Sequence, residues 1–169
     1  MRHLLFFLAV ISSIPSFGQS AAEKLTAQYE LRSGTIIEHI KGNELKQSLN
    51  EANTFQLMRT MLGKPATNKL KGIAQNIKEG AMLIIPTRTA KETQEIENQL
   101  QNLKKSGYRP YNNKEGELPI LIKEGSNGAA DELVTFKKME ERNWFFMLIL
   151  KGEWSVLKGG GRKTYPFAL

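Results

Sequence analysis

Apolar positions recur with two different periods along the chain, first every three or four residues and then, after residue 107, every second residue. The first period is typical of helices that bury one face, and the second is typical of strands. Two short apolar runs interrupt the first part and are too short for helices. The pattern predicts helices over 21–31, 43–62, 65–77 and 89–105, and strands near 35–41 and 81–86.

The predicted helix 89–105 has signals at both ends. Thr89 and Glu92 have the spacing of a capping box, in which each side chain bonds a free amide of the first turn. Lys104 and Lys105 stand where the helix dipole favours cations, and Gly107 suits a left-handed cap. The helix is therefore expected to begin after Thr89 and to end before Gly107.

The second half of the chain consists of short segments of period two, separated by turn clusters such as "EGSNG" at 124–128. We predict strands near 108–113, 117–124, 131–138 and 144–151. Short connections favour antiparallel neighbours, so these strands are expected to form a C-terminal four-strand meander. The predicted fold is α+β: a single domain over 19–158 with one mainly antiparallel sheet and helices packed on one face. Residues 159–169 are expected to form a flexible tail.

An apolar run from Leu4 to Ile14 follows Arg2 and His3 and is shorter than the roughly 20 residues that span a bilayer. After Pro15, the residues Ser16, Phe17 and Gly18 give the small-x-small pattern that a signal peptidase accepts. We predict a signal peptide over residues 1–18 and a mature chain that begins at Gln19. An uncleaved membrane anchor is the alternative. The expected location is periplasmic or secreted, with no transmembrane segment after cleavage.

The composition of the chain limits its stabilising bonds and its possible partners. The chain of 169 residues has no cysteine and a formal net charge of +7, which loss of Arg2 with the leader lowers by one. Without disulfides, the exported domain must be stabilised by its core. The lysines are scattered and lack interleaved aromatic residues, so we expect no nucleic-acid partner. A basic surface is compatible with an anionic envelope polymer.

Candidate catalytic residues are few. His39 is the one histidine that remains after removal of the leader, so zinc sites of the usual kinds lack ligands and a Cys-His pair is excluded. We expect no catalytic residue, no metal and no cofactor. Carboxylates are the remaining option: Glu92, Glu95 and Glu97 are expected on an exposed helix face, whereas Glu132 and Glu153 flank strand positions without an identifiable partner.

The segment "WFFMLILKGEW" at 144–154 is apolar on both faces of the strand that it predicts. We expect the helices to cover one face and the other to bind a partner, since large exposed apolar patches mark interaction sites. The residues assigned to this partner surface are Phe145, Met147, Ile149, Leu133 and Lys137. In the alternative, the first helix or the segment from Glu153 to Leu169 folds over this face.

Several short motifs resemble a family of small exported proteins of the Bacteroidetes, the domain-of-unknown-function family four-two-five-two. They are "LKKSGY" with Gly107 and Tyr108, "ELV" at 132–134, and the ending "LKG" at 150–152. Many members carry a lipoprotein cysteine, which this chain lacks. The resemblance implies the fold and the compartment, and no activity.

Two functions follow as expectations. The first is an exported non-catalytic protein that binds a partner: a second copy of the chain, an envelope protein or an anionic polymer. The alternative is a carboxylate-based hydrolase that acts on envelope polysaccharide. A pocket that holds two carboxylates within about 10 Å of each other would favour the hydrolase.

Overall fold

The computed structural model describes residues 19–48, 56, 59–61, 63, 76–111, 119–126, 128–154, 157–159 and 162–164. The expected signal peptide lies outside these residues. So do most of the predicted helix 65–77 and much of the predicted helix 43–62. The predicted helices 21–31 and 89–105 lie within the described ranges in full.

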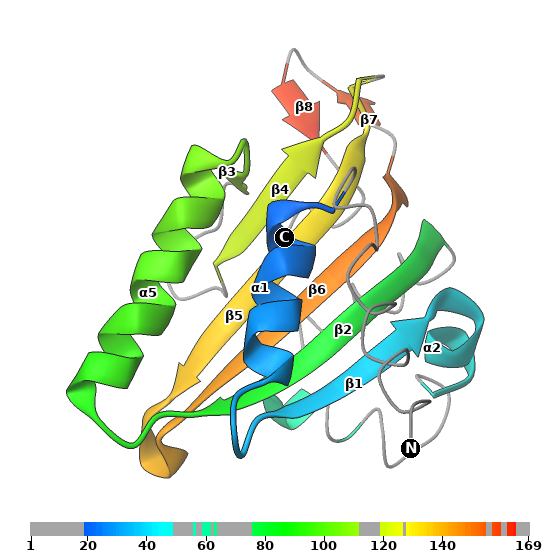
Figure 1. The fold of residues 1–169 in the computed structure, drawn as a ribbon. Coiled ribbons are helices and arrows are strands. Elements are labelled where there is room, and N and C mark those ends of the chain that lie inside the picture. The colour runs from blue at the N-terminus through cyan, green and yellow to red at the C-terminus, as the bar shows by residue number, and fades with distance from the viewer. Residues whose placement is uncertain are drawn as a thin grey trace, which may run out of the picture.

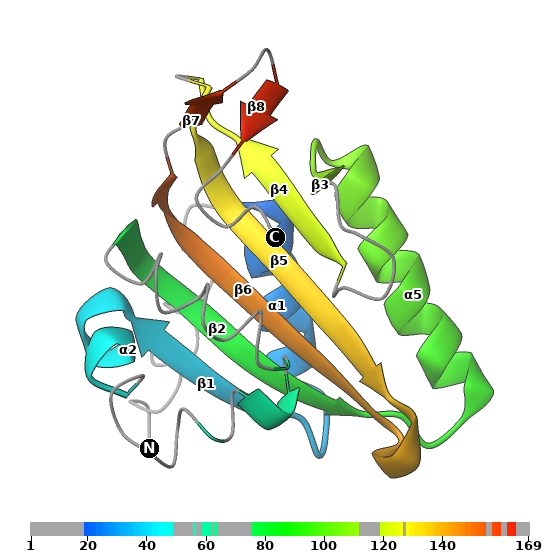
Figure 2. The same ribbon diagram turned by 180° about the vertical axis from the view of Figure 1, so that it is seen from behind.

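A six-stranded sheet forms the centre of the molecule (Figure 1). Its strands lie in the order β1-β2-β6-β5-β4-β3, and every neighbouring pair is antiparallel. The strands are β1 (Ile36–Lys41), β2 (Ile77–Pro86), β3 (Arg109–Tyr111), β4 (Ile120–Glu124), β5 (Ala130–Met139) and β6 (Trp144–Trp154). The long strands β2, β6 and β5 are central, and the shorter strands β1 and β3 form the edges (Figure 2).

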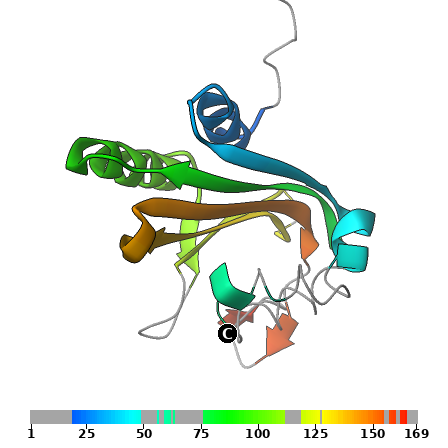
Figure 3. The ribbon, with the colours of Figure 1, turned by 90° about the horizontal axis from the view of Figure 1, so that it is seen from below.

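Two helices, α1 (Ala21–Glu30) and α5 (Ala90–Lys105), lie on the same side of this sheet (Figure 3). A short helix, α2 (Gly42–Ser48), follows β1 directly, and a single turn of 3₁₀ helix, η2 (Glu140–Arg142), connects β5 to β6. The hairpin of β7 (Leu157–Gly159) and β8 (Arg162–Thr164) lies on the opposite side of the sheet from α1.

Both large helices begin at capping boxes. Ser20 caps α1 together with Glu23, and Thr89 caps α5 together with Glu92, as the sequence predicts for α5. At the other end of α5, Gly107 has a φ of +91°, a conformation that residues with a side chain rarely adopt. Local sequence therefore determines where α5 starts and stops.

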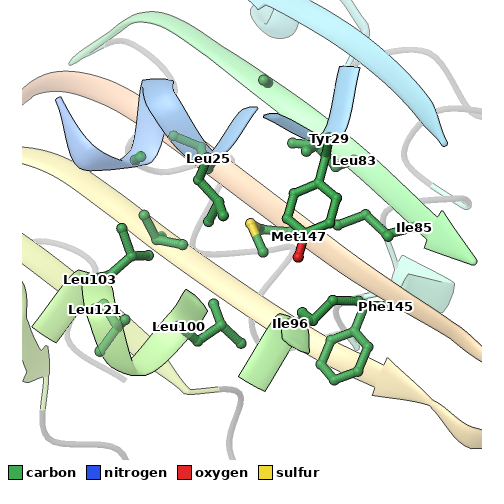
Figure 4. Packing of buried hydrophobic residues seen from close by; sticks show 14 of the residues in the cluster. Leu25, Tyr29, Leu83, Ile85, Ile96, Leu100, Leu103, Leu121, Phe145 and Met147 are labelled. Carbon is green, nitrogen blue, oxygen red and sulfur yellow. The ribbon is translucent and has the colours of Figure 1, made fainter. Parts of the chain in front are cut away.

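Each face of the sheet carries its own apolar cluster. On the first face, α1 contributes Leu25 and Tyr29, and α5 contributes Ile96, Leu100 and Leu103 (Figure 4). These side chains pack on the sheet residues Leu83, Ile85, Leu121, Val134, Phe145, Met147 and Ile149. The second face buries sheet residues that include Ile122, Phe146, Leu148 and Leu150, together with Met61 from outside the sheet. Residues on both sides of β6 are thus core residues.

The α+β class and the antiparallel sheet are confirmed. Strands β3 to β6 pair in sequence order, as in the predicted meander, but β3 has only three residues and the segment 112–118 before β4 is outside the described residues. The prediction that helix 65–77 continues to Ile77 is wrong, because Ile77 pairs with Gly152 and begins β2. Pairing with β6 overrides the local helical period there.

In the described part of the C-terminal segment, Leu157–Gly159 pairs with Arg162–Thr164 in a two-stranded sheet. The flexibility expected of residues 159–169 stays a prediction.

Candidate functional site

The five residues that the sequence assigns to a partner surface lie on two different faces of the sheet. Phe145, Met147 and Ile149 lie under α1 and α5, where Met147 is 0% exposed. Figure 4 shows Phe145 and Met147 among the side chains of both helices. The alternative in which the first helix covers this face matches the structure. These three residues therefore form core contacts and offer no surface to a partner.

Leu133 and Lys137 lie on the other face of the sheet. Leu133 pairs with Leu150 and Lys137 pairs with Phe146, and directly opposed residues of an antiparallel pair point to the same side. Leu133 is buried in the second cluster. The five residues thus do not meet, because side chains alternate between faces and sequence alone leaves the register of β5 against β6 undetermined.

A different feature is open to solvent: a groove of about 360 Å³ between α1 and the strands β1 and β2. Its lining includes Ala27 of α1 and Ala81 of β2, whose small side chains leave the space beside α1 open. Gly80 precedes Ala81 on β2, and a Cβ there would lie 2.5 Å from the carbonyl oxygen of Ile149. The close approach of β2 to β6 therefore requires glycine at this position.

Lys151 of β6 lies in this groove between two carboxylates. Its ammonium donates a hydrogen bond to Glu23 of α1 and lies 3.4 Å from the Oε1 of Glu79 of β2. Burial would raise the pKa of the Glu23 carboxyl, but the hydrogen bonds from Lys151 and from the Ser20 backbone outweigh it and lower the pKa. Burial would likewise lower the pKa of Lys151, but Glu23 outweighs it and raises the pKa. Glu23 and Lys151 therefore carry opposite charges at neutral pH.

Exposed charges line the rim of the groove. His39 of β1 lies 3.5 Å from Glu30 of α1, and both side chains are more than half exposed. Lys41 lies 3.7 Å from Glu44. The groove thus brings together His39, Glu30, Glu79 and Glu23, which the sequence places on three separate elements.

Beside the groove, a buried polar network attaches the start of α1 to the sheet. The hydroxyl of Tyr108 donates to the Oε2 of Glu132 at 2.5 Å and accepts from the N–H of Ala22 at 3.4 Å. Lys123 lies 3.7 Å from the other carboxylate oxygen of Glu132. Burial, followed by the hydrogen bond to Glu132, raises the pKa of Tyr108. The sequence identifies no partner for Glu132, and the structure shows that its partner is Tyr108.

The other carboxylates weighed from sequence have ordinary roles. Glu92 completes the cap of α5 and pairs with Arg32 at 2.8 Å, while Glu95 and Glu97 are exposed. Glu153 lies 3.9 Å from Lys78. Within the described ranges, no group of three or more metal-ligating side chains is close enough to hold a metal ion. None of the described helices is long and apolar enough to cross a membrane.

No protein-family model, no curated protein and no solved structure matches the chain. The resemblance to the exported Bacteroidetes family therefore stays a prediction.

Proposed function

We propose that the chain is an exported, non-catalytic binding protein, and that it receives an extended segment of a protein partner at the outer edge of β1. The observation that carries this proposal is the coincidence of three features: the edge strand β1, the groove beside α1 and exposed apolar residues. An edge strand presents unpaired backbone N–H and C=O groups, and strand addition is a common way to use them.

The exposed apolar residues lie where such a segment would begin. Leu31 is 90% exposed and Ile36 is 59% exposed, and they are the large hydrophobic residues exposed in the described part of the chain. Leu31 caps the end of α1 and Ile36 opens β1, so both flank the turn that connects α1 to β1. No described strand pairs with the outer edge of β1. A single peptide ligand could thus pair with the backbone of β1 and contact these apolar side chains.

The groove carries charges of both signs. Glu30 and Glu79 are more than half exposed there, and so are His39 and Lys41. Glu38 is exposed on the opposite face of β1, because it pairs with Met82 of the second cluster. Although the whole chain is basic, this edge therefore suits a peptide with both acidic and basic side chains.

The alternative hydrolase has one observation in its favour. Glu23 and Glu79 both contact the ammonium of Lys151, so their nearest oxygens lie well within the upper limit of about 10 Å for paired glycosidase carboxylates. Glu23, however, accepts from Ser20 at 2.6 Å and from Lys151, and its pKa is lowered. The lowered pKa excludes Glu23 as the general acid, and Glu79, the remaining candidate, is more than half exposed to solvent. We therefore favour binding. Release of reducing ends from envelope polysaccharide, abolished in Glu79→Gln, would reverse this choice.

Selection of random peptides on phage against the mature protein tests the binding proposal. We expect enriched peptides to bind wild type, and Ile36→Lys to weaken the best synthetic peptide at least tenfold in fluorescence polarisation. Gln101→Lys adds the same charge to the exposed face of α5 and should leave the affinity unchanged. Absence of enriched peptides, or equal binding by Ile36→Lys, would contradict the proposal. Preferential binding of an anionic polysaccharide would contradict it too.

Proline substitutions test strand addition itself. Neighbouring N–H groups of a strand point to opposite edges, so Glu38→Pro and His39→Pro remove one amide that faces β2 and one that faces outward. We expect one variant to remain folded, because proline is tolerated at the open side of an edge strand, and to lose peptide binding. A folded variant of this pair with unchanged affinity would exclude backbone pairing.

A further inference from the structure

The first turn of α1 is complete without any residue before Ser20. The N–H of Glu23 donates to the Oγ of Ser20 at 3.1 Å, and the N–H of Ser20 donates to the Oε2 of Glu23 at 2.6 Å. The N–H of Ala22 donates to the hydroxyl of Tyr108. A chain that begins at Gln19 therefore keeps the cap of α1 and its attachment to the sheet.

Gln19 itself is exposed and lines the groove beside α1. The signal-peptide pattern predicts cleavage directly before this residue, between Gly18 and Gln19. Cleavage there would create a new α-amine on a residue whose own side chain ends in a carboxamide. Because Ser20 is held by the cap and Gln19 lies outside the helix, the amine and the carboxamide are free to approach each other.

We propose that Gln19 cyclises to pyroglutamate once residues 1–18 are removed. The α-amine nitrogen attacks the side-chain carbonyl carbon Cδ, and a new C–N bond closes a five-membered lactam. The bond from Cδ to the amide nitrogen breaks, and that nitrogen leaves as ammonia with a proton from the amine. The step needs neither an oxidant nor a co-reactant.

The site favours the neutral lactam over a free ammonium. Residue 19 lies at the N-terminus of α1, where the helix dipole disfavours a positive charge. Glu23, the carboxylate nearest in sequence, already accepts from Ser20 and Lys151. Cyclisation therefore gives the groove a neutral end that carries amide hydrogen-bonding groups. This inference depends on removal of the leader and is independent of the binding role.

Mass spectrometry of the protein exported from its native cell tests the proposal. Free amines are labelled in the fresh extract before purification, so that cyclisation during handling is not counted. We expect an N-terminal peptide that begins at residue 19, carries no label and is lighter than linear glutamine by one ammonia. Pyroglutamyl aminopeptidase should then release the lactam and expose Ser20.

Gln19→Ala is the matched control, since alanine also suits the peptidase but cannot cyclise. This variant should begin at residue 19 with a labelled amine. A labelled, linear Gln19 in the wild type would overturn the proposal, and so would a chain that retains residues 1–18 or begins elsewhere. Either result would leave the peptide selection at β1 unaffected, so the two proposals can fail separately.

Discussion

Tyr108 and Glu132 show how two residues with no visible pattern position a whole helix. Tyr108 is 2% exposed and follows the end of α5, while Glu132 is buried on β5, 24 positions later. Their hydrogen bond supplies the donor that a buried carboxylate requires, and the same hydroxyl accepts from the first turn of α1. The pair therefore connects α1, β5 and the end of α5.

Tyr108→Phe removes the hydroxyl and keeps the ring. We expect the free energy of unfolding in urea to fall by about 1–3 kcal/mol, since a buried carboxylate and a backbone amide each lose a partner. Glu97→Gln, which changes an exposed carboxylate, should stay within about 0.5 kcal/mol of wild type. A Tyr108→Phe protein as stable as wild type would show that Lys123 alone satisfies Glu132.

Comparison of wild type with Tyr108→Phe also isolates the pH dependence of stability that Tyr108 causes. The folded pKa of Tyr108 is raised above the value of about 10 that it has when unfolded. Its contribution to stability is thus complete below pH 10 and decreases as the pH rises toward the folded pKa, because only the unfolded state loses the proton. We expect wild type to lose more stability than Tyr108→Phe between pH 9 and 11 in urea titrations. Parallel curves would contradict the assignment.

At the scale of elements, helix caps could be predicted from sequence better than strand pairing. The cap of α5 is where Thr89 and Glu92 place it, because the interaction is local. The capping box of α1, formed by Ser20 and Glu23, has the same local spacing, although the apolar stripe alone predicts that helix without it. The start of β2 at Ile77 could not be predicted, since it depends on pairing with β6.

Ser20→Ala tests the cap of α1. We expect a loss of about 1 kcal/mol in the free energy of unfolding, because the N–H of Glu23 loses its acceptor. Ser33→Ala, in the exposed turn after α1, is the matched control and should change stability little. Circular dichroism during urea unfolding measures both variants. Equal stability of the two would mean that the bond from Ala22 to Tyr108 is sufficient to hold the first turn.

At the scale of the whole molecule, the α+β class and the antiparallel sheet could be predicted, because the apolar period and the turn residues recur at many positions. The groove could not, because its small lining residues Ala27 and Ala81 come from elements far apart in the chain and give no local signal. The faces of β6 could not be assigned either. Phe145 and Phe146 are equally apolar, so only the position of α1 and α5 distinguishes a helix-covered side from the other.

Because both faces of β6 are buried, a lysine should destabilise the fold far more on β6 than at an exposed position of β1. Met147→Lys places a charge where the side chain is 0% exposed and the neighbours are apolar. An unpaired buried charge costs several kcal/mol, which is comparable with the roughly 5–15 kcal/mol that stabilise an ordinary domain. We therefore expect Met147→Lys to abolish cooperative thermal unfolding. Ile36→Lys should unfold within a few degrees of wild type, because Ile36 is 59% exposed on an edge strand.

Light scattering combined with circular dichroism separates this expectation from a dimer held together through Phe145, Met147 and Ile149. If that face joined two copies, wild type would have twice the mass of the chain and Met147→Lys would be a folded monomer. The packing of α1 and α5 against Met147 predicts instead that the variant loses its tertiary structure whatever the mass of the wild type. A folded, monomeric Met147→Lys would require α1 to leave the sheet, contrary to its attachment through Tyr108.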